Sequence, residues 1–249
     1  MDIVAGIRRS VDKRGVAGTW QFAGRLALSA LSGRMLLKTL RQRAVRRSDM
    51  EFDARNDVVT AGEVRSSDLR TDSDNKLFAA AYQPIDATHF RDALAELDIR
   101  YEDYAFIDLG CGKGRALLLA AEFPFRRLVG VEFDPQLVAT AEANISRYPA
   151  TRDRAGEVQV LCEDAATYVL PPGPLLLYMY NPFEAPVMER VVANVRRSLE
   201  REPRALVVVY FTPLCAQAWD GFEPLRRMPG SVDPAVYFTA RAATAGTDP

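Results

Sequence analysis

The sequence is poor in histidine and cysteine, and this limits the chemistry that it can perform. Its 249 residues include one histidine, His89, and three cysteines, Cys111, Cys162 and Cys215. The cysteines are odd in number and far apart, so they match neither a disulfide framework nor a metal site. We therefore expect no metal, and we interpret the cysteines as small reduced core residues. The chain shows no His- or Cys-based catalytic constellation, and His89, next to Phe90 on an expected helix, reads as structural.

Long apolar runs are also missing. No stretch approaches the roughly 20 apolar residues that a membrane-spanning helix needs. The early basic residues, Arg8, Arg9, Lys13 and Arg14, are not followed by the continuous apolar segment of a secretory signal. Together with reduced cysteines, these absences favour a cytoplasmic protein. A hydrophobic content of 48% is enough for a full core and argues against global disorder.

Charge is distributed unevenly along the chain. Residues 1–50 contain 11 basic and 3 acidic residues, whereas the rest contains 21 basic and 30 acidic ones. Within residues 19–47, apolar and basic positions recur at helical spacing. This stretch could be an amphipathic helix docked on the domain, an arm that contacts a membrane surface, a nucleic acid or another acidic partner, or a transit peptide. The sequence leaves these alternatives open.

The remaining chain divides by composition. Residues 48–80 are rich in Asp, Ser, Thr and Asn, which predicts a linker with little regular structure. We therefore expect a basic helical extension and polar linker over 1–80, a folded domain over 81–242 and a flexible tail over 243–249.

Alternating strands and helices organise residues 81–242. Strands are predicted at 104–109, 127–132, 158–162, 175–180 and 204–211, and helices at 87–97, 115–122, 135–147 and 185–201. Continuous apolar runs such as Ala205-Leu-Val-Val-Val-Tyr210 are typical of parallel strands covered on both faces. Segments 222–228 and 235–241 flank a turn and predict a terminal antiparallel hairpin. The pattern indicates an α/β fold, a doubly wound Rossmann-like mixed sheet of seven strands.

A glycine-rich loop follows the first of these strands. It reads Asp108-Leu-Gly-Cys-Gly-Lys-Gly-Arg115, with glycines at 110, 112 and 114. Glycine lets the backbone turn tightly and approach a ligand closely because it has no Cβ. Strand, loop and helix together predict the start of a nucleotide-binding unit. The spacing differs from the dinucleotide fingerprint, which argues against a nicotinamide enzyme.

This loop resembles motif I of the class I S-adenosylmethionine-dependent methyltransferases. Two more acids support the resemblance, since Glu132 and Asp164 follow the next two strands. The resemblance implies that S-adenosylmethionine is the cofactor and that Glu132 binds its ribose hydroxyls. It implies that Asp164 accepts from the adenine amino group. The cofactor-binding residues expected on this basis are Asp108, Gly110, Cys111, Gly112, Gly114, Glu132, Phe133, Asp164, Ala165 and Asn181. Lys113 and Arg115 are expected to face solvent.

The methyl acceptor is predicted from Asn181-Pro182-Phe183, after the fourth strand. This segment resembles the Asn-Pro-Pro-Tyr/Phe signature of methyltransferases that act on nitrogen, although the second proline is absent. The resemblance implies that the Asn181 side chain and a proline carbonyl hold an amine while the aromatic ring packs on the substrate. The alternative is an ordinary turn in which Asn181 caps the next helix.

Tyr82-Gln-Pro84 completes the set of motifs. It resembles a Tyr/Phe-x-Pro element that closes over the cofactor in seven-strand lysine methyltransferases, whose motif I is similar to the one here. The expected catalytic residues are therefore Asn181, Pro182, Phe183 and Tyr82, and the favoured acceptor is a protein lysine. A small molecule or nucleic acid as acceptor, or a non-catalytic cofactor-binding module, remain alternatives.

Overall fold

The computed structural model describes residues 40, 43–153 and 157–239. The chain separates into two compact units, Met1–Ser48 and Asp49–Pro249. Most of the basic stretch 19–47 and the tail 243–249 lie outside the described residues, so the predictions made for them stay predictions. Everything below concerns the second unit.

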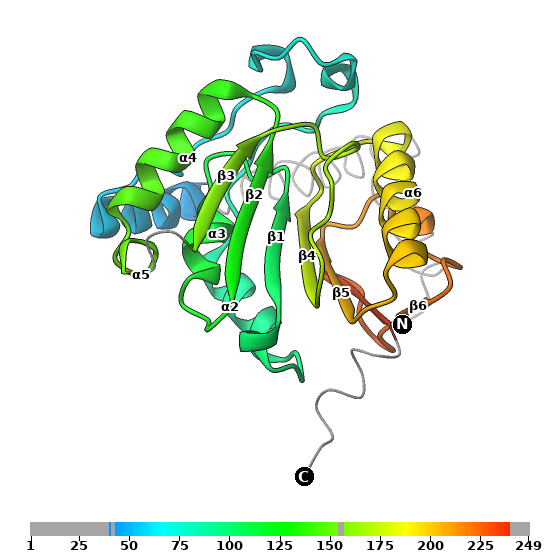
Figure 1. The fold of residues 1–249 in the computed structure, drawn as a ribbon. Coiled ribbons are helices and arrows are strands. Elements are labelled where there is room, and N and C mark those ends of the chain that lie inside the picture. The colour runs from blue at the N-terminus through cyan, green and yellow to red at the C-terminus, as the bar shows by residue number, and fades with distance from the viewer. Residues whose placement is uncertain (1–39, 41–42, 154–156, 240–249) are drawn as a thin grey trace, which may run out of the picture. The chain divides into compact units, whose positions relative to one another are not determined.

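A seven-stranded mixed sheet forms its centre, with the strand order β3-β2-β1-β4-β5-β7-β6 (Figure 1). The strands are β1 (Ala105–Leu109), β2 (Arg127–Glu132), β3 (Val158–Cys162), β4 (Leu175–Tyr180), β5 (Leu206–Phe211), β6 (Leu225–Arg227) and β7 (Ala235–Thr239). The first five pair in parallel, and β7 lies antiparallel between β5 and β6. The predicted doubly wound fold and its terminal antiparallel hairpin are confirmed.

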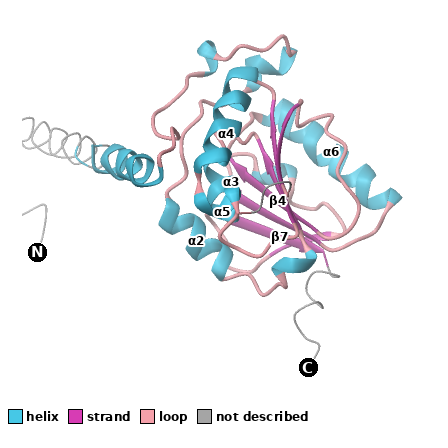
Figure 2. Cartoon of the chain, turned by 60° about the vertical axis from the view of Figure 1, so that its left-hand side comes forward, coloured by secondary structure: helices cyan, strands magenta, loops and turns pink. Residues whose placement is uncertain are grey.

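Helices cover both faces of the sheet (Figure 2). The principal ones are α2 (Ala87–Ala95), α3 (Arg115–Ala120), α4 (Pro135–Arg147) and α6 (Ala185–Arg201), with the short α5 (Pro149–Arg152) after α4. All five residues of β1 are buried, and the pleat sends Phe106 into the core with α2 and α3 but Ile107 into the core with α6. Burial on both faces explains why the parallel strands read as continuous apolar runs.

The polar segment before the sheet is more ordered than we predicted. Residues 49–56 are helical, and two short 3-10 helices follow, η1 (Ser66–Asp68) and η2 (Asp74–Phe78). Six of its described residues are buried: Asp49, Phe52, Val58, Thr60, Leu69 and Asn75. The prediction of a linker with little regular structure is therefore wrong for residues 49–80. Their polar side chains bond to one another and to the domain, a pattern that composition alone does not distinguish from a solvated loop.

The three cysteines differ in burial. Cys111 and Cys215 are buried, but Cys162 at the end of β3 is exposed, so its assignment to the core is wrong. The described part of the chain contains no group of three or more potential metal-ligating side chains. None of its helices has the length and apolar character needed to cross a membrane.

Candidate cofactor and acceptor site

One pocket lies at the carboxyl edge of the sheet, where β1 and β4 are neighbours. The strand order reverses there, which is the position at which open α/β sheets bind ligands. The pocket is lined by residues of the three motifs predicted from the sequence, namely Tyr82, Asp108, Gly110, Cys111, Gly112, Glu132, Phe133, Asp164, Ala165, Pro182 and Phe183. Segments separated by a hundred residues along the chain thus meet at one place.

Two glycines of the loop make this meeting possible. Gly112 has φ +54°, and a Cβ there would lie 2.1 Å from a ring carbon of Tyr82. Gly110 has φ +82°, and a Cβ there would lie 2.6 Å from Cβ of Pro182. The glycine loop is therefore in close contact with the Tyr-x-Pro element on one side and the Asn-Pro-Phe segment on the other. Gly114 is different, since its nearest neighbour is Ala141 of α4 and it does not line the pocket.

Glu132, at the end of β2, is 5% exposed and accepts three backbone hydrogen bonds. Oε2 accepts from Gly112 N at 2.9 Å, and Oε1 accepts from Phe133 N at 2.9 Å and Asp134 N at 3.0 Å. Burial raises the pKa of Glu132 to about 7, although the three N–H groups favour the charged form. A carboxylate can accept about four hydrogen bonds, so this one still has room for a ligand hydroxyl.

Asp108, at the end of β1, is 3% exposed, and no described residue donates a hydrogen bond to its carboxylate. Burial, and next the charge of Glu132, raises its pKa well above the usual value. Asp108 lines the pocket, so its carboxylate is suited to accept from a ligand that carries N–H or O–H groups.

Asp164, after β3, is held by the segment that precedes the sheet. Its Oδ2 accepts from Ser73 Oγ at 2.8 Å and Asn75 Nδ2 at 2.5 Å, and its Oδ1 accepts from Ala166 N at 2.9 Å. Arg190 of α6 donates to Asn75 Oδ1 at 2.8 Å, which fixes the orientation of that amide. Asn75 also lines the pocket. No motif in the sequence pointed to Ser73 or Asn75, because polar residues in a polar stretch give no periodic signal.

Asn181 lies in a left-handed conformation, φ +40°, directly after β4. It does not cap α6, because the N-cap residue of that helix is Glu184. Among the described residues, its side chain has one hydrogen bond, a long one of 3.5 Å from the Tyr210 hydroxyl to Oδ1. The carbonyl of Pro182 accepts from Ala80 N at 3.0 Å and keeps a second lone pair. Strained non-glycine residues of this kind concentrate at functional sites.

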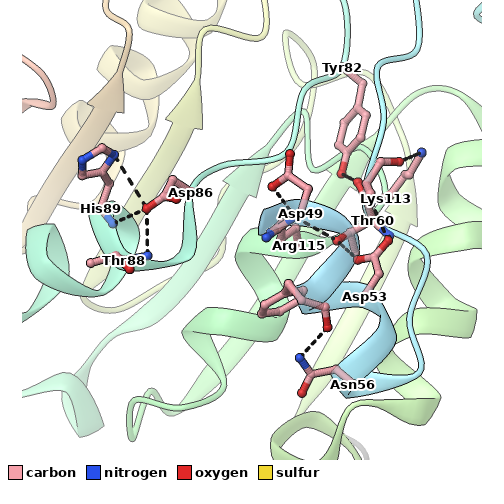
Figure 3. A network of polar contacts seen from close by, with 12 residues as sticks. Asp49, Asp53, Asn56, Thr60, Tyr82, Asp86, Thr88, His89, Lys113 and Arg115 are labelled. Carbon is pink, nitrogen blue, oxygen red and sulfur yellow. Dashed lines mark hydrogen bonds and ion pairs between the residues drawn. The ribbon is translucent and has the colours of Figure 1, made fainter. Parts of the chain in front are cut away.

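The prediction that Lys113 and Arg115 face solvent is wrong for Arg115 (Figure 3). Its side chain is 3% exposed, its Nη1 lies 2.9 Å from Asp49 Oδ1, and its guanidinium lies 4.3 Å from the ring centre of Phe52. Lys113 is partly buried and donates from Nζ to the carbonyl of Ala61 at 2.7 Å. Both cations point towards the segment before the sheet, whose folding the sequence did not predict. His89 lies outside the pocket lining and is exposed on α2 beside Asp86.

The charge of the lining indicates the kind of ligand that the pocket accommodates. Four carboxylates line it, Asp108, Glu132, Glu163 and Asp164, and the only lining cation among the described residues, Arg115, is paired with Asp49. Aromatic rings of Tyr82, Tyr178, Tyr180 and Phe183 complete the wall. Acids and aromatic faces suit a ligand with a positive centre, hydroxyls and amino groups. S-adenosylmethionine, with its sulfonium, ribose diol and adenine, has these properties.

Comparison with known proteins gives one family match. Residues 106–202 match the family described as "Methyltransferase domain". A search of curated protein sequences gives no match. The matched range begins in β1 and ends just after α6, so it includes Asp108, Glu132, Asp164 and Asn181.

Solved structures with a similar fold are distant in sequence. A predicted N6-adenine-specific DNA methylase from Listeria monocytogenes is 12% identical, with a TM-score of 0.47, over 62% of this chain and 50% of that one. An RNA methyltransferase from Salinibacter ruber, in complex with S-adenosyl-L-homocysteine, is 19% identical, with a TM-score of 0.43, over 63% and 92%. For a structure described as StiE O-MT, the values are 16%, 0.31, 43% and 36%. The chain thus spans less than half of that last structure.

The motif I loop, the strand order and the family match all indicate a methyltransferase domain. Residues 106–202 are similar to a methyltransferase domain, and this range runs from β1 through β4 and includes the pocket residues Asp108, Glu132 and Asp164.

Proposed function

We propose that this protein transfers a methyl group from S-adenosylmethionine to a nitrogen atom, and that the acceptor is the side chain of a protein lysine. The observation that carries the proposal is Asn181. Its left-handed backbone lies between Tyr180 and Pro182, which line the pocket although Asn181 itself does not, it caps no helix, and the chain after it packs on the glycine loop through Pro182. An asparagine held in this way can accept a hydrogen bond from an amine through Oδ1.

The charge of the pocket supports an amine over an anionic acceptor. Tyr180, at the end of β4, has Asp233, Asp49 and Asp86 near enough to raise the pKa of its hydroxyl, after the effect of its burial. The four carboxylates that line the pocket favour a cationic side chain such as a lysine ammonium over a phosphate-bearing chain. Phe183 and Tyr82 offer faces on which the aliphatic part of such a side chain can pack.

The reaction needs alignment more than proton transfer. Bound S-adenosylmethionine supplies a methyl group on a positively charged sulfur. Asn181 Oδ1 and the free lone pair of the Pro182 carbonyl would hold the N–H groups of the neutral amine, so that its lone pair faces that methyl group. The bound cofactor would supply the methyl group, the two protein groups would only bind and orient the amine, and the methylated ammonium would lose one of the amine's own N–H protons to solvent. Positioning of this kind can account for much of an enzyme's rate enhancement.

Labelling tests the acceptor. Purified protein would be incubated with methyl-labelled S-adenosylmethionine and an extract from cells that lack it, and the labelled species identified by mass spectrometry. We expect label on lysine, lost by more than about 90% in Asn181→Ala, because the substitution removes the alignment. Cofactor binding should remain, and Gln136→Ala, which truncates an exposed amide on α4, should behave as the wild type. Label on nucleic acid or on a small molecule would contradict the lysine proposal.

Methylation of a nucleic acid is the second candidate, and the basic residues before position 48 motivate it. That alternative predicts RNA or DNA binding that weakens steeply with salt and is lost when residues 1–47 are removed. A protein that binds the cofactor but labels nothing would instead be a binding module.

A further inference from the structure

The helical residues 49–56 and the loop after them form a polar network against the pocket (Figure 3). Asp53 is its centre. Oδ2 of Asp53 accepts from the backbone N–H groups of Thr60 and Ala61, both at 2.7 Å, and Oδ1 accepts from Thr60 Oγ1 at 2.6 Å. Three short hydrogen bonds to one carboxylate fix the conformation of the loop, and Thr60 is completely buried.

The network reaches the pocket through Tyr82. The Tyr82 hydroxyl donates to the carbonyl of Thr60 at 2.8 Å, and the Tyr82 backbone pairs with Val64 in an isolated bridge. The ring of Tyr82 lies against the backbone of Gly112 and lines the pocket. Asp53 thus fixes Thr60, and Thr60 fixes the hydroxyl end of the ring that covers the glycine loop.

The same loop is tied independently to the other side of the glycine motif. Lys113 donates to the carbonyl of Ala61 at 2.7 Å, and Arg115 Nη1 donates to Thr60 Oγ1 at 3.4 Å. Asn144 of α4 accepts from Val59 N at 2.7 Å and donates to the carbonyl of Lys113 at 2.9 Å. These hydrogen bonds hold the loop in place against the glycine motif, and the loop in turn holds the Tyr82 hydroxyl.

We propose that Asp53 and Thr60 are positioning residues for the cofactor, which set the Tyr82 ring over the glycine loop. Neither residue lines the pocket, and both precede the range matched by the methyltransferase family. The inference rests on the proposed use of the pocket for S-adenosylmethionine, but it does not depend on which acceptor is methylated.

A double-mutant cycle on the full chain tests this. The probe is S-adenosylhomocysteine, which cannot be turned over, and its Kd is measured by calorimetry for Asp53→Ala, Tyr82→Phe and the double variant. Each single substitution should weaken binding about fivefold, the effect of about one hydrogen bond. The double variant should also bind about fivefold more weakly than the wild type. Without the Tyr82 hydroxyl the ring has no hydrogen bond to the loop, so the loss of Asp53 has no further effect on it.

Matched variants separate positioning from folding. Thr60→Ser keeps the hydroxyl that donates to Asp53 and should bind as the wild type, whereas Thr60→Val, which removes one of the three hydrogen bonds to Asp53, should weaken binding but less than Asp53→Ala does. Urea unfolding without ligand reports stability separately. Unchanged affinity in folded Asp53→Ala, or a double variant weakened about 25-fold, would overturn the proposal. Absence of binding by the wild type would instead refute the cofactor assignment itself.

Discussion

Gly112 shows how much one missing Cβ determines in this site. Its φ of +54° is unfavourable for an L-residue, and the Tyr82 ring occupies the space that a Cβ would need. Backbone conformation and close contact therefore both require glycine at this position. Gly62 has φ +83° but nothing within 4 Å of the position of a Cβ, so the two requirements can be separated.

We predict that Gly112→Ala abolishes cofactor binding and that Gly62→Ala does not. Both substitutions cost about 1 kcal/mol of stability for the positive φ, but only Gly112→Ala adds roughly 1–3 kcal/mol of steric overlap and displaces Tyr82. Unfolding in urea and titration with S-adenosylhomocysteine measure the two effects. Equal stability and equal binding of the two variants would show that Tyr82 does not pack where the structure places it.

Glu132 makes cofactor affinity depend on pH. Burial raises the pKa of Glu132 from 4.5 to about 7 in the folded protein. At pH values between these two, the chain therefore takes up a proton when it folds. Its contribution to the free energy of unfolding is greatest below about pH 4.5 and is lost as pH rises through about 7. Ribose hydroxyls donate to the carboxylate form of Glu132. Cofactor affinity should therefore rise as pH rises, whereas the contribution of Glu132 to the free energy of unfolding falls.

We predict that the affinity for S-adenosylhomocysteine rises up to about tenfold per pH unit from pH 6 to 7 and levels off above. Glu132→Gln cannot titrate, so its affinity should be weak and nearly constant over this range. Calorimetry at several pH values measures both. A Glu132→Gln variant that keeps the pH dependence of the wild type would assign the titration to another group, with Asp108 the first candidate.

At the scale of elements, the buried pair between Arg115 of α3 and Asp49 ties the helical residues 49–56 to the helix that follows the glycine loop. Arg115 and Asp49 are 3% and 9% exposed at the side chain, whereas Arg91 and Glu122 form a similar pair at 41% and 27%. A buried charge left without its partner is costly, and an exposed one is not.

Arg115→Ala should therefore lower the free energy of unfolding by about 3–5 kcal/mol, and Arg91→Ala by about 1 kcal/mol or less. Urea denaturation of the two variants under identical conditions gives the comparison. A similar loss in the free energy of unfolding for both variants would mean that burial of the Arg115 pair does not increase its contribution to stability.

These elements also show where the sequence was informative. Six predicted ranges, β2, β3, β4, α4, α6 and the start of α3, agree with the structure because apolar runs and helical spacing end at Gly, Pro or an acid. Residues 49–80 gave no such signal. Their burial depends on pairs such as Asp53 with Thr60 and Asn75 with Asp164, whose members are recognised only when the fold brings them together.

At the scale of the molecule, the compact unit that contains the sheet begins at Asp49. The sequence suggested a domain over 81–242, but Asp164 receives hydrogen bonds from Ser73 and Asn75, and Tyr82 donates to Thr60. The segment before the sheet thus supplies part of the pocket wall.

We predict that residues 49–249 fold and bind S-adenosylhomocysteine, and that residues 81–249 do not bind it. The shorter piece loses the donors to Asp164 and the carbonyl that fixes Tyr82, and it exposes the apolar surface under Phe52 and Leu69. Circular dichroism and calorimetry on both pieces test this. Full binding by residues 81–249 would show that the segment before the sheet is dispensable.

The proposed function requires that S-adenosylmethionine binds at the edge where β1, β2 and β4 end. Calorimetric titration of the full chain with S-adenosylmethionine measures this directly, together with Asp108→Ala and Glu132→Ala. We expect one molecule bound per chain by the wild type, and at least about a tenfold loss of affinity in each variant, because each removes a buried acceptor of charge-assisted hydrogen bonds. No binding by the wild type, or unchanged binding by both variants, would contradict the account.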